Sequence, residues 1–302
     1  MNPTFLEALQ KILEKEQYKI AEPMSSHITF RVGGNADCYI KPSIHQLPEV
    51  LKLCKQYQQP FMVIGNGSNL LVGDKGIRGV VIELGKPASA VRIEENKVIA
   101  EAGAMLSAVA RQAAREGLSG MEFASGIPGT IGGAVVMNAG AYGGEMKDII
   151  TSVTVLTQEG EQKKLSLEEL ELGYRHSCIP EKEYIVLNAE LQLFFEEKEK
   201  IEARMEELKQ QRVSKQPLEY PSAGSTFKRP EGYFAGKLIQ DAGLRGFQVG
   251  GAQVSEKHCG FVINKDHATA ADIDCLIKEV QQKVEQQFGV KLETEVKYVG
   301  EF

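Results

Sequence analysis

A glycine-rich segment, residues 120–144, contains the residue types best suited to binding a phosphate group. It reads GMEFASGIPGTIGGAVVMNAGAYGG and holds eight of the chain's 30 glycines. Glycine permits positive φ and lets another group approach the main-chain N–H donors closely, and phosphates bind such donors. The segment is therefore predicted to be no ordinary helix or strand but a path for a phosphate-bearing ligand. A sharply turning loop that only packs is the alternative.

A second candidate loop, Gly65-Asn66-Gly67-Ser68-Asn69, directly follows an apolar run at 61–64. Leu70 stands where G-x-G-x-x-G needs its third glycine, and the chain contains no G-x-x-x-x-G-K-[ST]. The usual dinucleotide and P-loop fingerprints are therefore excluded. The loop can still form a nest of N–H donors for a pyrophosphate, with a plain turn as the alternative.

The elements before this second loop predict a parallel α/β unit. Asn2 and Pro3 start a helix that is expected to end near Gln17, and Ser43 is expected to cap a second helix. A strand at 38–41, that helix and the strand at 61–64 place the loop at a strand's carboxyl end.

The middle of the chain alternates between strand and helix patterns. A helix at 105–116 is closed by Gly117, and a charged helix at 196–211 is expected to connect domains. The remaining predicted strands of this part are 80–84, 97–100, 152–156, 164–166 and 185–194.

The C-terminal third is predicted to be a compact α+β module of about 85 residues, a plausible domain size. Thr269 and Asp272 form a capping pair for a long helix that Gly289 ends. Another helix is expected at 234–242, and strands are expected at 247–254, 261–264 and 292–299.

Composition limits the classes of function. A net charge of -6 argues against nucleic-acid and membrane-surface partners, and no apolar run approaches the roughly 20 residues of a membrane span. The first residues do not resemble a signal peptide. Five cysteines without C-x-x-C spacing indicate reduced thiols of a cytosolic protein. The five scattered histidines are interpreted as structural or surface residues, so no metal site is expected.

Seven strings occurring in order carry a family resemblance: SHITFRVGG, GNGSNLL, GIPGTIGGAVVMNAGAYG, GYRHS, SAGSTFKRP, AGLRGFQVGGAQVSEKHCGFVIN and LETEV. They resemble the UDP-N-acetylenolpyruvoylglucosamine reductase family, MurB, and the match runs in order from about Ser26 to Val299. Only 50 residues separate Arg175 from Ser225 (225 − 175), which resembles the shorter second subtype, without an extra loop over the substrate.

The resemblance implies an α+β fold with a two-part FAD-binding domain of the vanillyl-alcohol-oxidase (PCMH) type and a smaller α+β substrate domain. The expected boundaries are 1–85 and 86–200 for the two FAD-binding subdomains and 201–302 for the substrate domain, with a connector helix at 196–214. It also implies a cytoplasmic enzyme of peptidoglycan precursor synthesis that binds FAD. NADPH would be the hydride source, and UDP-N-acetylglucosamine-enolpyruvate would be reduced to UDP-N-acetylmuramate.

Carried over residue by residue, the resemblance assigns Arg175 and Glu295 to stabilising an enolate and Ser225 to donating a proton. The expected FAD contacts are Gly65, Asn66, Gly67, Ser68, Asn69, Gly126, Gly129, Thr130, Gly132, Gly133, Asn138, Ala139 and Gly140. The expected substrate contacts are Lys215, Lys228 and Gln253. Arg229 stands where some members of the other subtype carry asparagine, so no sugar contact is assigned to it.

The chemistry of the reaction supports these three catalytic roles independently of the resemblance. Hydride addition to an enol ether that bears a carboxylate produces an enolate, which needs preorganised donors in a dry site. The planar cation of Arg175 suits a carboxylate, whereas Glu295 helps only if burial raises its pKa so that it stays protonated. The alternatives are a solvated strand face for Glu295, a turn serine for Ser225 and an ion pair of Arg175 with the acidic run at 168–171.

Two other functions stay open at this point. The chain could be a flavin- or nucleotide-binding module without turnover, or another oxidoreductase on the same FAD fold. The three catalytic residues argue against the first function. The SAGSTFK and GGAQVSEKHCG strings argue against the second.

Overall fold

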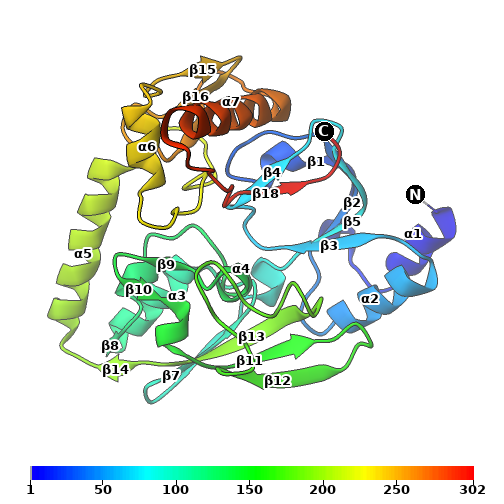
Figure 1. Cartoon of the computed structure of the whole chain (residues 1–302). Coiled ribbons are helices and arrows are strands. Elements are labelled where there is room, and N and C mark those ends of the chain that lie inside the picture. Colours follow the sequence, from blue (N-terminus) through cyan, green and yellow to red (C-terminus); the bar gives the residue numbers. More distant parts are fainter. Residues whose placement is uncertain (1) are drawn as a thin grey trace. The chain divides into compact units, whose positions relative to one another are not determined.

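The computed structural model describes residues 2–302 (Figure 1) and divides them into two compact units. Unit 1 consists of residues 2–19, 38–66 and 79–212, and unit 2 of residues 20–37, 67–78 and 213–302. Each unit is thus built from three separate stretches of the chain. The predicted division of the N-terminal part into FAD-binding subdomains 1–85 and 86–200 stays a prediction.

Seven α-helices are distributed over residues 2–302. They are α1 (Pro3–Leu9), α2 (Leu47–Gln56), α3 (Leu106–Arg115), α4 (Ile131–Met137), α5 (Lys198–Lys215), α6 (Ala235–Asp241) and α7 (Ala270–Phe288). None of these helices is long and apolar enough to cross a lipid bilayer.

Unit 1 contains a five-stranded antiparallel sheet with the order β12-β11-β13-β7-β6. Its strands are β6 (Val91–Glu94), β7 (Lys97–Glu101), β11 (Ile150–Leu156), β12 (Gln162–Ser166) and β13 (Ile185–Gln192). Helix α4 packs against β13 and β7. The apolar residues of α3 are buried at positions 106, 109, 110 and 113, the spacing of one helix face.

A four-stranded sheet has the order β1-β2-β5-β3, and three of its strands contain or adjoin a boundary between the units. Its strands are β1 (Tyr18–Pro23), β2 (Asn35–Ile40), β3 (Phe61–Ile64) and β5 (Ile77–Glu83). Strands β3 and β5 pair in parallel, with Ile64 opposite Glu83. Two short antiparallel pairs complete unit 1, namely β8 (Leu118–Ser119) with β14 (Phe194–Phe195) and β9 (Gly140–Ala141) with β10 (Gly144–Glu145).

Unit 2 contains the small sheet β15-β16-β17, against which α7 packs (Figure 1). Its strands are β15 (Gln248–Val249), β16 (Ala252–Val254) and β17 (Val262–Asn264). A further pair, β4 (Leu70–Val72) and β18 (Lys297–Val299), is parallel. Asp74 accepts hydrogen bonds from the backbone N–H groups of Ala270 and Ala271, both at 2.9 Å, and so caps α7 from the β4 stretch.

Local sequence signals predicted several of these elements correctly. Asn2 caps α1, the Thr269–Asp272 capping box starts α7, and Gly289 ends α7 with φ +69°. Gly117 follows α3 with φ +70°. These positions agree because capping depends on residues within one turn of the helix end.

Other expected boundaries are wrong. The first helix ends at Leu9 rather than near Gln17, and α2 begins at Leu47 rather than after a Ser43 cap. Ser43 instead binds the Gln46 side chain, with its N–H 2.9 Å from Oε1. The stretch 247–254 is a hairpin, and the last strand covers only Lys297–Val299 of the expected 292–299. The glycine-rich segment contains a helix, α4, although its composition predicted neither helix nor strand.

Candidate functional site

The two glycine-containing loops of the sequence meet in unit 1. The Asn66 Nδ2 donates to the Pro128 carbonyl at 2.8 Å, although 62 residues separate them. A Cβ atom at Gly65 would lie 2.2 Å from the Thr130 Oγ1, closer than any real Cβ contact. Glycine at position 65 therefore lets these two loops approach each other, as two parts of one binding site require.

The N-terminal turn of α4 is held against Ala102, the residue that directly follows β7. Thr130 is the N-cap and accepts from the Gly133 N–H at 3.5 Å. The Gly132 N–H donates to the Ala102 carbonyl at 2.8 Å, and a Cβ at Gly132 would lie 3.0 Å from the Ala102 Cβ. Gly132 therefore packs against protein, whereas Gly126 and Gly133 are exposed. Gly129 accepts from the Leu106 N–H at 3.0 Å.

Asn138 is a fully buried hydrogen-bonding centre with φ +41°. Its Nδ2 donates to the Glu145 Oε2 at 2.7 Å and to the Gly173 carbonyl at 3.0 Å, and its Oδ1 accepts from the Lys147 N–H at 2.9 Å. Ala139 accepts from the Met146 N–H at 2.9 Å. The Asn138 side chain thus ties the end of α4 to the hairpin of β9 and β10 and to the turn that carries Arg175.

Arg175 occupies a strained position in a tight turn of unit 1. Gly173 and His176 exchange backbone hydrogen bonds at 3.1 and 3.3 Å, and Arg175 between them has φ +54°. The Arg175 Nη2 donates to the Gly140 carbonyl at 3.2 Å, and the guanidinium lies over the Tyr174 ring at 5.1 Å. Positive φ at a residue other than glycine persists only when its surroundings hold it there, so this turn is built to present Arg175.

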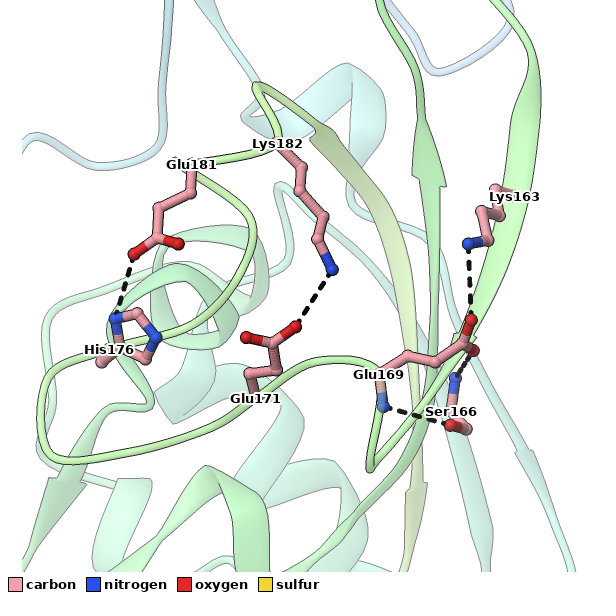
Figure 2. Close-up of polar contacts among 7 residues, drawn as sticks. All are labelled: Lys163, Ser166, Glu169, Glu171, His176, Glu181 and Lys182. Atoms are coloured by element: carbon pink, nitrogen blue, oxygen red, sulfur yellow. Dashed lines mark hydrogen bonds and ion pairs between the residues drawn. The ribbon is translucent and has the colours of Figure 1, made fainter.

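Figure 2 shows ion pairs around the loop that leads to this turn. Glu169 pairs with Lys163 at 3.3 Å and Glu171 with Lys182 at 3.1 Å. These carboxylates of the acidic run therefore have lysine partners. His176 lies 3.9 Å from Glu181.

Arg212, near the C-terminus of α5, is a residue that the sequence did not single out. A Cβ at Gly126 would lie 3.0 Å from the Arg212 Cδ. Burial lowers the pKa of the Arg212 guanidinium, while the nearby Tyr142 favours its charged form. No carboxylate among residues 2–302 forms an ion pair with Arg212. In the sequence it is one more charge on a charged helix, and no local signal distinguishes it.

Unit 2 brings Ser225 and Glu295 onto neighbouring backbone segments. The Glu295 N–H donates to the Thr226 carbonyl at 2.8 Å, and the Lys228 N–H donates to the Glu293 carbonyl at 2.8 Å. Thr226 is fully buried and its Oγ1 accepts from the Val262 N–H at 2.9 Å, whereas Ser225 is exposed. The buried threonine fixes the segment and leaves the side chain of its serine neighbour exposed.

The end of the Gly65–Asn69 loop belongs to the same part of unit 2. The Asn69 Nδ2 donates to the Glu295 carbonyl at 3.1 Å, and the Asn69 carbonyl accepts from the Lys297 N–H at 2.9 Å. The Gly67 carbonyl accepts from the Thr29 N–H at 3.3 Å, and Ser68 is half-buried. Glu295 is itself half-buried.

The three predicted substrate residues have different surroundings. Lys215 is the exposed last residue of α5. The Lys228 Nζ lies 3.1 Å from the Glu293 carboxylate, and Gln253 is buried on β16 with its Nε2 donating to the Gly246 carbonyl at 3.3 Å. Gln253 is therefore held by unit 2 itself. Its substrate role stays a prediction, as do the other assigned contacts.

Two family descriptions match separate parts of the chain. Residues 36–166 match the family described as FAD binding domain, and residues 216–299 match the family described as UDP-N-acetylenolpyruvoylglucosamine reductase, C-terminal domain. The chain is 57% identical to the UDP-N-acetylenolpyruvoylglucosamine reductase of Agathobacter rectalis over 100% of both chains. It is 53% identical to that of Clostridioides difficile over 97% of both.

Solved structures lead to the same family. The chain is similar to MurB from Thermus caldophilus with a TM-score of 0.80 and 36% identity, over 94% of this chain and 98% of that one. An alkyldihydroxyacetonephosphate synthase, at 15% identity and a TM-score of 0.50 over 65% of this chain and 41% of its own, shares the fold alone. The predicted FAD-binding fold and the resemblance to MurB are confirmed. The chain belongs to the UDP-N-acetylenolpyruvoylglucosamine reductase family, MurB, whose members are FAD-dependent oxidoreductases.

Proposed function

We propose that this protein uses NADPH to reduce the enolpyruvyl ether of UDP-N-acetylglucosamine-enolpyruvate, giving UDP-N-acetylmuramate for peptidoglycan synthesis in the cytoplasm. The observation that carries the proposal is the pairing of the Ser225–Lys228 segment with residues 293–295. This pairing fixes a hydroxyl and a carboxyl, the two groups assigned to the proton and the enolate, on adjacent backbone in a chain of this family.

The residues of unit 1 fit FAD. A half-buried guanidinium without a carboxylate partner is unfavourable unless a ligand supplies compensating charge or hydrogen-bond acceptors. Arg212 is such a group, and it lies beside Gly126 of the glycine-rich segment. We therefore assign to Arg212, with the exposed backbone at Gly126 and Gly133 and the loop at Gly65 and Asn66, the role of holding FAD. When bound, FAD supplies hydride transfer between NADPH and the acceptor.

Arg175 is assigned to the carboxylate of the enolpyruvyl group. Its fork is oriented by the Gly140 carbonyl and the Tyr174 ring, so little reorganisation is needed when negative charge develops on the substrate. Glu295 is assigned to hydrogen bonding with the same developing enolate. Ser225 then gives its hydroxyl proton to the carbon next to the carboxylate, which completes the reduction of the double bond.

The test is anaerobic stopped-flow spectroscopy of holoenzyme carrying Ser225→Ala, followed at the flavin absorbance. We expect the variant to retain FAD and to be bleached by NADPH at close to the wild-type rate. The return of colour on adding the enolpyruvyl substrate should collapse, and Ser225→Cys, which keeps a transferable proton, should recover part of it.

Three outcomes would count against parts of the proposal. Reoxidation of Ser225→Ala within a few-fold of wild type would mean that another donor or water supplies the proton. A yellow wild-type protein that NADPH does not bleach would identify a binding module. Bleaching without reoxidation by this substrate would identify an oxidoreductase with a different acceptor.

A further inference from the structure

Ser177, the last residue of the GYRHS string, is a buried serine two residues beyond Arg175 in unit 1. Ser177 is only 1% exposed, and its Oγ donates to the Val136 carbonyl at 2.8 Å, although 41 residues separate the two. Val136 belongs to the last turn of α4. The Ser177 hydroxyl therefore joins the turn that carries Arg175 to the C-terminal end of a helix.

The carbonyl that Ser177 reaches is one that a helix leaves open at its C-terminus. The last four carbonyls of an α-helix have no donor within the helix and need partners from outside it. In α4, the carbonyls at 134 and 135 accept from the backbone N–H groups of residues 139 and 138 at 2.8 and 3.1 Å. The next carbonyl, that of Val136, accepts from Ser177. A side chain from a distant loop thus takes part in ending this helix.

Side-chain hydrogen bonds hold the Arg175 turn to the end of α4 on both sides of Arg175. The Asn138 Nδ2 donates to the Gly173 carbonyl at 3.0 Å before Arg175, and the Ser177 bond to α4 follows it. The Arg175 Nη2 itself donates to the Gly140 carbonyl at 3.2 Å, just beyond the same helix. The position of the Arg175 guanidinium is therefore defined relative to α4.

The ion pairs of the same loop hold it less firmly than the Ser177 bond does. Figure 2 shows the pair of Glu171 with Lys182, whose side chains are 56% and 43% exposed. Exposed ion pairs are screened by solvent and stabilise little. The Ser177 hydroxyl is shielded from water, so its loss leaves a carbonyl without its donor in a place that water does not easily reach. Ser177 is therefore the stronger restraint on the turn.

Helix α4 connects the Arg175 turn to the segment that we assign to FAD. Its first turn follows the N-cap Thr130, and the Gly132 N–H donates to the Ala102 carbonyl at 2.8 Å. The helix contains seven residues, which corresponds to about 10 Å at about 1.5 Å per residue. It is thus a short, rigid spacer between the glycine-rich segment and the guanidinium assigned to the substrate carboxylate.

A group that stabilises developing charge acts only when it is held in place before the reaction. We propose that Ser177 is a positioning residue for the reduction of the substrate, and that its hydroxyl sets the place of the Arg175 guanidinium relative to α4; this rests on the proposed function. Ser177 acts through Arg175 and does not itself contact the substrate.

Equilibrium binding to the oxidised holoenzyme, measured by calorimetry, tests the carboxylate contact without turnover. UDP-N-acetylmuramate, the proposed product, carries the carboxylate, whereas UDP-N-acetylglucosamine carries none. Ser177→Ala should weaken the binding of UDP-N-acetylmuramate about 3- to 10-fold and leave that of UDP-N-acetylglucosamine unchanged. Ser119→Ala removes a half-buried hydroxyl of unit 1 that donates to the Glu122 carboxylate at 2.8 Å. It is the matched control and should change neither affinity.

Anaerobic stopped-flow kinetics show whether Ser177 acts through Arg175. In Ser177→Ala, flavin reoxidation by the enolpyruvyl substrate should slow about 10- to 100-fold, because negative charge grows in the transition state, while bleaching by NADPH stays unchanged. In an Arg175→Lys background the same serine change should slow reoxidation by less than about twofold, because residues that act as one unit have non-additive effects. Ser177→Cys, with a side chain of similar size and a weaker donor, should lie between wild type and Ser177→Ala.

The failure of this proposal and that of the proposed function give different results. Wild-type reoxidation in Ser177→Ala, or an equal slowing by this change in the Arg175→Lys background, would overturn the positioning role and leave the function standing. Equal weakening of both nucleotide-sugars, or loss of FAD in both Ser177→Ala and Ser177→Cys, would show a purely structural serine and would also overturn it. If the enolpyruvyl substrate does not reoxidise the wild-type enzyme, the proposed function fails, and this proposal fails with it.

Discussion

Replacing Asn138 by alanine should destabilise unit 1 by about 4.5–6 kcal/mol, whether or not FAD is bound. The amide is fully buried and makes three hydrogen bonds, one of them to the Glu145 carboxylate. The charged contact contributes about 1.5–3 kcal/mol and each neutral one about 1 kcal/mol. An alanine at φ +41° adds about 1 kcal/mol of backbone strain.

Asn138→Gly separates these contributions, because glycine adopts positive φ freely and still lacks the amide. It should recover about 1 kcal/mol relative to the alanine variant. Asn188→Ala, which removes a half-buried asparagine of β13 whose side chain has no partner within residues 2–302, is the control and should change stability by less than about 1 kcal/mol.

The assay is urea unfolding of the FAD-free and the FAD-saturated proteins, followed by circular dichroism. If Asn138 has a purely structural role, the variant should lose the same unfolding free energy with and without FAD. The stabilisation that added FAD provides should then be unchanged. A direct cofactor contact predicts the opposite pattern. If Asn138→Ala leaves the FAD-free protein as stable as wild type and loses only the stabilisation by FAD, the structural account is refuted and the predicted cofactor contact is supported.

Three further predictions concern residues in or near the two loops and the β4–β18 region. Glu295→Gln should lower turnover by about 10²–10⁴ with flavin bleaching by NADPH unchanged, and equal slowing of both half-reactions would make Glu295 structural. Gly132→Val should destabilise even the FAD-free protein by about 1–3 kcal/mol in urea unfolding, because its side chain meets Ala102, and full stability would contradict that packing. Burial raises the pKa of Glu83 to about 7 from 4.5, although the Lys41 Nζ lies 3.1 Å away. The folded protein therefore holds a proton that the unfolded chain releases, and stability falls as pH rises from about 4.5 to 7. Relative to wild type, Glu83→Gln should gain about 2 kcal/mol between pH 4.5 and pH 8 in urea unfolding, and a pH-independent difference would refute the shift.

The sequence predicted those features that depend on neighbouring residues. The capping of α7 by Thr269 and its end at Gly289 are determined within one helical turn, and both are observed. The family resemblance implied that both glycine loops contact the flavin, and the contact of Asn66 with Pro128 fits that expectation. The family and its cofactor followed from motifs that occur in order along nearly the whole chain.

Features that depend on distant residues could not be predicted from local pattern. Strand β18 was expected to be longer, because the pattern of 292–299 does not reveal that its only partner within residues 2–302 is the three-residue strand β4. Arg212 looked like a solvated charge until its burial beside Gly126 was known. Asn138 was assigned to the cofactor from its motif, and its amide makes three hydrogen bonds to protein, two from Nδ2 and one to Oδ1.

The construction of unit 2 from three separate stretches has a consequence for how the chain is made. During synthesis β4 and Asp74 leave the ribosome more than 200 residues before β18, and α7 emerges nearly as late. Until then, the β4 edge lacks its parallel partner and Asp74 has no helix to cap. We therefore expect unit 2 to fold only after α7 and β18 have left the ribosome. A C-terminal fragment starting at residue 213 would lack both β4 and Asp74 and should not fold alone.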